Sequence, residues 1–152
     1  MFHRHVITGR ASVLDGDCLY VGQTKIRLFG VDAPELNHPY GVKAKWALVN
    51  LCTGNLICAE AIATDWYGRR VARCTLPDGR DLSAEMVKQG LALDWPKYSS
   101  GRYAHLEPHG ARRMLWLADA RQQGQIQLWR DFDVASMPDA AKNLALEGGE
   151  AR

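Results

Sequence analysis

Five short stretches of alternating apolar and polar residues predict an α+β protein whose core is a β-barrel. The stretches form two groups, three strands and then two, with a helical segment between the groups. Further helical segments follow the fifth stretch, so that about three helices are expected. This arrangement matches the OB-fold, a five-stranded Greek-key barrel. The expected elements are strands over 6–13, 18–21 and 24–31, a helix over 42–52, strands over 55–63 and 70–76, and helices over 82–89 and 102–123.

The boundaries of these segments carry the residues that turns and caps require. Asp15-Gly16 and Gly22-Gln23 are turn dipeptides between the first three strands. Asp81 is the expected N-cap of the second helix. Pro108 is compatible with the last helix only if the regular part of that helix begins near it. The first helix has one apolar face, formed by residues at i, i+4, i+7 and i+8: Ala44, Leu48, Leu51 and Cys52.

The length of 152 residues suits one domain with a substantial core. Its 47% apolar and 24% charged residues are typical of a folded globular protein and argue against a disordered or fibrous one. We expect this domain to cover residues 1–135 and the segment 136–152 to form a frayed or partly helical tail. We also expect a monomer, with a homodimer through the C-terminal helix as the alternative.

The formal net charge of +2 is weak evidence for a polyanionic partner, but the basic residues cluster along the chain. Clusters lie at 69–73, 97–102 and 112–113. They suit a nucleic acid contact and equally suit ordinary solvated faces, so the charge pattern alone leaves both interpretations open.

No apolar run approaches the roughly 18 residues of a membrane span, so no membrane association is expected. The first residues lack the apolar core of a signal peptide, which predicts a cytoplasmic location for the chain as given. The alternative is export or a periplasmic location, if a signal was removed and Cys58 and Cys74 form a disulfide. These cysteines lie symmetrically about Trp66 in the predicted hairpin, and they suit equally well two small buried apolar side chains.

The residues that carry chemistry are concentrated between Asp15 and Glu35. Asp17 follows the first turn and Asp32 follows the third strand, so that two carboxylates come from the ends of adjacent strands. Arg27 lies between them in the sequence. Converging carboxylates beside an arginine suggest an oxygen-ligand cation site next to an anion-binding site.

Four short motifs occur in order along the chain: VLDGD at 13–17, RLFGVDAPE at 27–35, DWYGR at 65–69 and QGLA at 89–92. Each is weak alone, but together they resemble the staphylococcal nuclease (thermonuclease) family over about residues 8–129. The resemblance implies an OB-fold enzyme, a calcium-dependent endonuclease that hydrolyses DNA, RNA or both and leaves a 3′-phosphate.

The resemblance also implies a calcium site. By position it makes the carboxylates of Asp17 and Asp32 metal ligands, together with the backbone carbonyl of Ala33. Calcium takes six to eight hard oxygen ligands, so water and substrate phosphate would fill the remaining positions. The family often has threonine in place of Ala33, a change that removes a side-chain hydrogen bond and keeps the carbonyl ligand.

The catalytic residues carried over from the family are Arg27, Glu35 and Arg69. Glu35 would be the general base that takes a proton from the attacking water. The two arginines would meet the negative charge that builds on the phosphoryl oxygens. Trp66 stands where the best-known member has a lysine that touches phosphate, so this contact is either lost or replaced by stacking on a base. Tyr67 matches a family tyrosine and is the second candidate for a nucleotide contact.

A binding module is the alternative function. Some domains of this family keep the barrel and lose the chemistry, and serve to bind nucleic acid or protein. Loss of the acidic residues would indicate such a domain. This chain keeps the whole set that the family uses: Asp17, Arg27, Asp32, Glu35 and Arg69.

Overall fold

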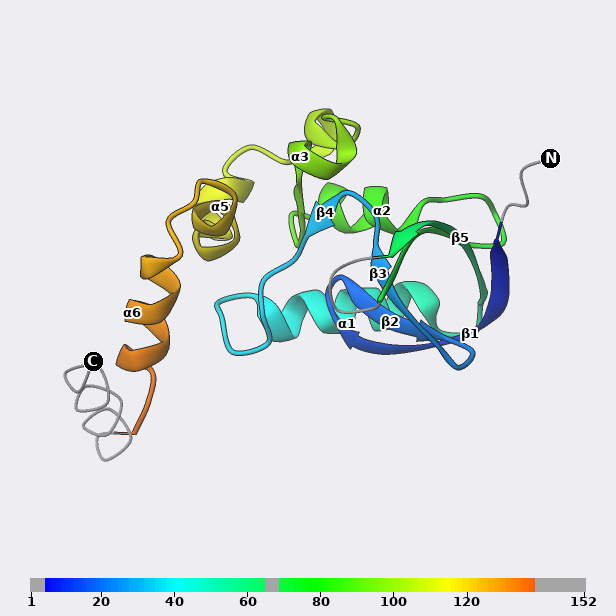
Figure 1. Cartoon of the computed structure of the whole chain (residues 1–152), viewed down its shortest axis with the longest axis horizontal. Helices are drawn as coiled ribbons and strands as arrows, with labels where there is room; N and C mark the ends of the chain where they lie inside the picture. Colours follow the sequence, from blue (N-terminus) through cyan, green and yellow to red (C-terminus); the bar gives the residue numbers. More distant parts are fainter. Residues whose placement is uncertain (1–4, 65–68, 139–152) are drawn as a thin grey trace.

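The computed structural model describes residues 5–64 and 69–138 of the chain. It contains a closed five-stranded barrel, a two-stranded sheet and several short helices (Figure 1). The strands are β1 Val6–Asp15, β2 Cys18–Val21, β3 Thr24–Leu28, β4 Val31–Asp32, β5 Leu56–Thr64, β6 Arg70–Thr75 and β7 Leu93–Asp94. The helices are α1 Gly41–Cys52, α2 Leu82–Lys88, α3 Pro96–Ser99, the 3-10 helix η1 Ala104–Leu106, α4 Ala111–Met114, α5 Trp116–Gln122 and α6 Gln127–Ala135.

The barrel confirms the predicted α+β class and OB-fold. Its strand order is β1-β2-β3-β6-β5, and antiparallel pairing of β1 with β5 closes it. β3 and β6 run parallel, whereas the other neighbouring barrel strands are antiparallel. The parallel pair joins the first group of strands to the second, so that the end of β3 lies beside the start of β6. This pairing brings Arg27 of β3 and Arg69, which directly precedes β6, to the same side of the barrel.

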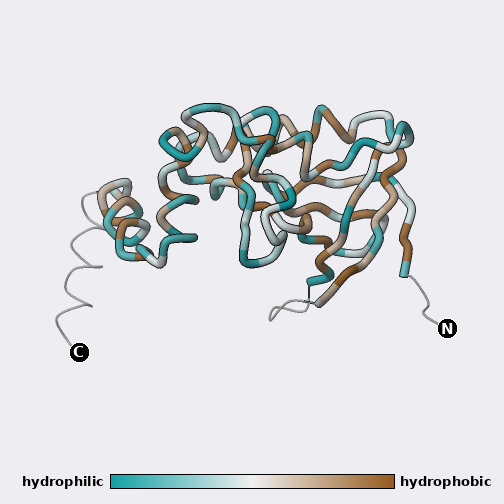
Figure 2. Tube along the Cα trace, turned by 90° about the horizontal axis from the view of Figure 1, so that it is seen from above, coloured by the Kyte–Doolittle hydropathy of each residue, from teal (hydrophilic) through white to brown (hydrophobic). Residues whose placement is uncertain are grey.

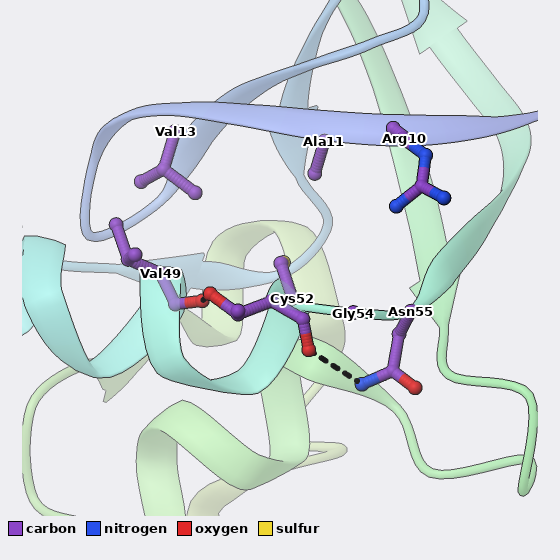
Figure 3. Close-up of a pocket in the computed structure, with 8 residues that line it drawn as sticks. Arg10, Ala11, Val13, Val49, Cys52, Gly54 and Asn55 are labelled. Atoms are coloured by element: carbon purple, nitrogen blue, oxygen red, sulfur yellow. Dashed lines mark hydrogen bonds between the residues drawn. The ribbon is translucent and has the colours of Figure 1, made fainter.

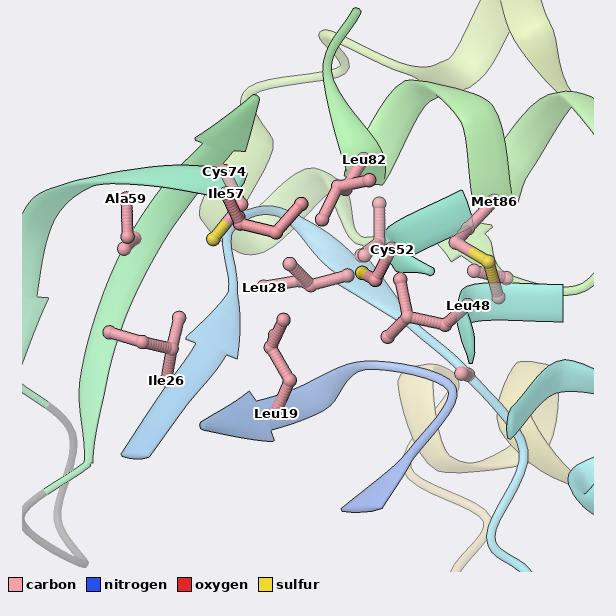
Figure 4. Close-up of a cluster of buried hydrophobic side chains, with 14 of the residues drawn as sticks. Leu19, Ile26, Leu28, Leu48, Cys52, Ile57, Ala59, Cys74, Leu82 and Met86 are labelled. Carbon is pink, nitrogen blue, oxygen red and sulfur yellow. The ribbon is translucent and has the colours of Figure 1, made fainter. Parts of the chain in front are cut away.

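Alternation along the strands fills the barrel interior. In β3, Ile26 and Leu28 are buried, whereas Lys25 is exposed and Arg27 lies on the same outer face as Lys25. Side chains from β2, β5, α1 and α2 complete the cluster in Figure 4, among them Leu19, Ile57, Leu48, Leu82 and Met86. The alternation therefore directs Arg27 away from the apolar core.

The third strand is shorter than predicted because the chain turns at Gly30. This residue has a φ of +73°, which interrupts the extended backbone between β3 and β4. A Cβ at Gly30 would lie 2.9 Å from the Cβ of Ser99 and 3.0 Å from Cε2 of Tyr103, so the site also needs the space that glycine leaves. The turn allows β4, which contains Asp32, to pair with β7.

The prediction of one continuous helix over 102–123 is wrong. The structure has η1, α4 and α5 in this segment. Pro108 lacks a backbone N–H and Gly110 has a φ of +83°, so regular helix begins only at Ala111. Leu115, with φ −95° and ψ 47°, then separates α4 from α5. The described part of the chain therefore holds six α-helices and one 3-10 helix in place of about three helices.

Of the two alternatives for Cys58 and Cys74, the structure contradicts the disulfide and has two free thiols. The register of β5 and β6 pairs Cys58 with Thr75 and Cys74 with Ala59. Because neighbouring residues of a strand point to opposite faces, the two thiols lie on opposite faces of the sheet. Cys74 is buried in the barrel and Cys58 is half-buried, and both are free, as are Cys18 and Cys52.

The barrel and the C-terminal helices lie at opposite ends of the molecule, as both views show (Figures 1 and 2). Hydrophobic segments run through the barrel strands in Figure 2, whereas α6 has no buried residue. α6 ends at Ala135 and residues 139–152 lie outside the described residues, so the boundary after residue 135 stays a prediction. Within residues 5–64 and 69–138, no helix has the length and apolar character that a bilayer crossing demands.

Candidate active site

A cavity of about 560 Å³ opens beside the barrel at the place where the predicted catalytic residues meet. Its walls come from the turn after β1, from β3, from the ends of β5 and β6 and from α5. The charged side chains that line it are Asp15, Asp17, Glu35, Arg27, Arg69 and Arg121. The aromatic side chains that line it are Phe29, Trp95 and Tyr98. Such a combination suits an anionic ligand that also carries flat rings.

The turn after β1 positions Asp17. The backbone N–H of Asp17 donates to Oδ1 of Asp15 at 3.1 Å, and Oδ2 of Asp17 accepts a hydrogen bond from the N–H of Ala33 at 2.8 Å. Gly16 allows this close approach, because a Cβ there would lie 2.8 Å from the Cβ atoms of both Ala33 and Ala44. The predicted turn therefore packs against the predicted ligand segment and the first helix.

Arg27 is fixed by three oxygen groups. Its guanidinium forms a salt bridge with Asp17, donates to the carbonyl of Val31 at 3.2 Å and approaches Oδ1 of Asp32 at 3.8 Å. Burial alone would raise the pKa of Asp17, but the charge of Arg27 outweighs it and lowers this pKa below its usual range. The pair is therefore ionised and rigid before any ligand binds.

Two further carboxylates have raised pKa values. Burial, followed by the charge of Asp17, raises the pKa of Asp15 to about 7. The same two causes in the same order raise the pKa of Glu35. The side chain of Glu35 is nevertheless 41% exposed, so water can reach its carboxylate. A carboxylate that is both accessible and more basic than usual suits the predicted role of general base.

Arg69 lies directly before β6 and lines the same cavity. Its positive charge lowers the pKa of Glu35 and so offsets part of the rise that burial causes. The structure thus brings Arg69 to the group that contains Arg27 and Glu35. Trp66 and Tyr67, the predicted substrate contacts, lie outside the described residues.

Arg121 is a site residue that the sequence prediction missed. It comes from α5, 89 positions after Asp32 in the chain, and its guanidinium binds both oxygens of that buried carboxylate. Nε donates to Oδ2 of Asp32 at 3.1 Å, and Nη2 forms a salt bridge with Oδ1. Nη1 also donates to Oε1 of Glu35 at 3.3 Å. One arginine therefore holds a predicted metal ligand and the predicted base.

Two indole rings surround this arginine. The guanidinium carbon of Arg121 lies 4.5 Å from the ring centroid of Trp129 and 5.2 Å from that of Trp95. Burial lowers the pKa of Arg121 to about 10, which still leaves the side chain charged at neutral pH. The sequence did contain a sign of this role, because Arg121 lies on the same helix face as the buried Leu117. A charge on a buried helix face requires a partner of opposite charge.

Asp17 and Asp32 are hard oxygen donors of the kind that calcium prefers. In this structure guanidinium groups engage both carboxylates, Arg27 with Asp17 and Arg121 with Asp32. Among the described residues, no group of three or more His, Cys, Asp and Glu side chains is arranged to hold a metal ion. The two carboxylates match calcium in donor type, but in this structure guanidinium groups take the positions that the ion would need.

A second cavity, of about 140 Å³, lies between β1 and the end of α1 (Figure 3). Ala11 and Val13 from β1 face Val49 and Cys52 from the helix there. Among the described residues that line it, Arg10 is the one with a charge. It therefore lacks the combination of acids and arginines found in the larger cavity.

The family model described as Staphylococcal nuclease homologue matches residues 25–131. The chain belongs to the staphylococcal nuclease family. This match confirms the resemblance to the family; it begins within β3, ends within α6 and contains the last three of the four motifs.

Several curated proteins are similar to this chain. An uncharacterized endonuclease of Escherichia coli O157:H7 is 31% identical over 111 residues, which cover 68% of this chain and 72% of that protein. Protein ParB of Escherichia coli is 29% identical over 131 residues, 78% of this chain and 70% of that protein. The probable staphylococcal-like nuclease CAN1 of Oryza sativa subsp. japonica is 31% identical over 71% of this chain and 33% of that protein.

Proposed function

We propose that this protein is a nuclease that hydrolyses phosphodiester bonds of DNA, RNA or both. Family membership and the endonuclease names of its relatives support a nuclease. The observation that carries the proposal is the single cavity lined by Glu35, Arg27 and Arg69, which provides a base beside two guanidinium groups. A phosphodiester carries the negative charge that such guanidinium groups bind.

The arginines would stabilise the transition state. Attack on phosphorus adds negative charge to the phosphoryl oxygens, and paired guanidinium N–H groups match those oxygens in geometry. Asp17 and the carbonyl of Val31 hold Arg27 in place, so little reorganisation is needed when substrate arrives. Arg69 adds a second positive charge from the β6 side of the cavity.

Glu35 would act as the general base. Burial and the neighbouring Asp17 charge raise its pKa, which strengthens it as a proton acceptor for water. By family resemblance, the expected product carries a 3′-phosphate. Base contacts by Trp66 and Tyr67 are proposed on the same ground.

We also propose calcium as the cofactor, with Asp17, Asp32 and the carbonyl of Ala33 as the protein ligands. When bound, the ion supplies positive charge next to the phosphoryl group and lowers the pKa of nearby water. The fit of the donors supports this proposal, although Arg121 must first release Asp32.

A cleavage assay tests the proposal. Purified protein with millimolar calcium should degrade single-stranded DNA or RNA, and excess chelator should stop the reaction. Arg69→Ala should slow cleavage by about 10²- to 10³-fold, because one charge-stabilising donor is lost. Arg113→Ala, which removes an exposed arginine of α4, is the matched control and should leave the rate unchanged. Intact DNA and RNA beside an active control nuclease would overturn the proposal.

A binding module remains the second candidate, because the hydrogen bonds from Arg121 occupy the carboxylates of Asp32 and Glu35, which catalysis would need free. Such a module would retain nucleic acid in a gel-shift or fluorescence-anisotropy measurement and cleave none of it. Cleavage that depends on Arg69 excludes this candidate.

A further inference from the structure

We propose that Arg121 sets the affinity of the site for a divalent cation, because its guanidinium competes with the cation for the Asp32 carboxylate. This inference rests on the proposed calcium-dependent nuclease and adds a residue that none of the four motifs contains. The metal-free chain neutralises its own buried carboxylate, and a cation binds when Arg121 withdraws.

The contacts of Asp32 show how strong this competition is. The carboxylate is fully buried, and Arg121 binds both of its oxygens. The nearest guanidinium nitrogen of Arg27 is 3.8 Å from Oδ1, which is beyond hydrogen-bond distance. A buried carboxylate requires a positive partner, so either Arg121 or a cation must occupy this position. Both at once would place two positive charges against one carboxylate.

Arg121 also holds the predicted base. Its Nη1 donates to Oε1 of Glu35 at 3.3 Å, so the same guanidinium engages Asp32 and Glu35 together. Withdrawal of one side chain therefore exposes a ligand for the cation and frees the carboxylate that accepts the proton. Cation binding and activation of the base are coupled through this residue.

Arg121 lies on α5, and the neighbouring helix α6, which covers its guanidinium, is attached in a way that permits this withdrawal. Trp129 of α6 contacts the guanidinium and donates its indole N–H to the carbonyl of Leu117. Asp133 of α6 accepts a hydrogen bond from Asn37 at 3.1 Å and lies 3.0 Å from Nε2 of His38. α6 has no buried residue, so a few polar and aromatic contacts keep it in place. Helices attached in this manner detach more readily than core elements.

The expected effect follows from the populations of the two states. Apparent affinity is the intrinsic affinity multiplied by the fraction of molecules that can bind. If Arg121 engages Asp32 in about nine molecules of ten, its removal should tighten cation binding about tenfold.

Isothermal titration of the full chain with calcium chloride tests the proposal. Arg121→Gln should bind calcium about tenfold or more tightly than the wild-type chain. Arg113→Gln, which removes the same charge from α4, should bind calcium with the wild-type affinity. A purely structural role of Arg121 would weaken binding or leave it unchanged when the residue is replaced. Equal or weaker binding by Arg121→Gln, or no binding by either protein, would overturn the proposal.

A second measurement uses the wild-type fold. In an NMR spectrum, the signal of the Arg121 side-chain Nε–H is assigned by comparison with Arg121→Lys. This proton should exchange slowly with water in the absence of metal and faster as calcium is added. An unchanged signal at saturating calcium would refute the competition even if Arg121→Gln did not fold. Tighter binding without nuclease activity would instead contradict the proposed function and leave the role of Arg121 standing.

Discussion

Replacing Gly16 with alanine should damage both the stability and the active site of this protein. The added Cβ would lie 2.8 Å from the Cβ atoms of Ala33 and Ala44, closer than such atoms approach in folded proteins. Both neighbours are methyl groups attached directly to the backbone, so neither can rotate away. The chain must therefore move at Ala33, at the first helix or at the turn itself.

The cost follows from overpacking of a well-packed site, which is about 1–3 kcal/mol. The effect on activity follows from the 2.8 Å hydrogen bond between the N–H of Ala33 and Oδ2 of Asp17. This bond lies next to the contact between residue 16 and Ala33 that must shift. A shift there displaces the carboxylate that fixes Arg27. We therefore expect lower stability together with slower cleavage.

Gly22→Ala is the matched control. Gly22 has a φ of +59° and no atom within 4 Å of an added Cβ, so alanine there is strained without overpacking. The strain costs about 1–2 kcal/mol, and Gly22 lies at the end of β2 that points away from Asp17. Urea unfolding should show that both variants are destabilised, and initial cleavage rates should fall only for Gly16→Ala. A Gly16→Ala stability within about 0.5 kcal/mol of wild type, or equal activity losses in both variants, would refute this reasoning.

Three further predictions concern the buried thiols and Tyr103. Burial raises the pKa of Cys52 to about 11 and that of Cys74 to about 12, from an ordinary value of 9.0. At neutral pH both thiols should therefore react with a thiol reagent only when the protein unfolds. The half-buried Cys58 should react before them. The thiols of the unfolded chain lose their protons at a lower pH than those of the folded chain, so the free energy of unfolding in urea should fall as the pH rises from about 9 to about 12. An equally steep fall in Cys74→Ala would contradict this cause. Tyr103→Phe removes the 2.6 Å hydrogen bond to Oδ2 of Asp81 and should cost about 1–2 kcal/mol in urea unfolding. Its cleavage rate should stay at the wild-type value, and an unchanged urea midpoint would show that the bond contributes nothing.

Much of the barrel could be predicted because its information is local. The turn at Asp15-Gly16, the strand over Cys18–Val21 and the N-cap of α2 each depend on residues that are neighbours in the sequence. Asp81 accepts a hydrogen bond from the N–H of Ser83 at 2.9 Å, as an N-cap should. The apolar face of the first helix was equally readable, since Ala44, Leu48 and Cys52 are all buried.

The remaining features depend on packing between distant segments. The turn at Gly30 follows from its contact with the segment around Tyr103, and the separation of Cys58 from Cys74 follows from a register that sequence symmetry did not specify. Arg121 reaches Asp32 only because α5 folds back across the cavity. Its position among apolar residues was a local sign of a buried charge, but nothing local named the partner.

The most direct test of catalysis in this cavity is the cleavage rate of Glu35→Gln on single-stranded DNA and RNA. Loss of a general base should reduce the rate by about 10²- to 10⁴-fold while the urea midpoint is retained. Glu85→Gln, the same change on α2, is the control and should cleave at the wild-type rate. A Glu35→Gln variant that cleaves as fast as the wild type would contradict the assignment of this cavity as the active site.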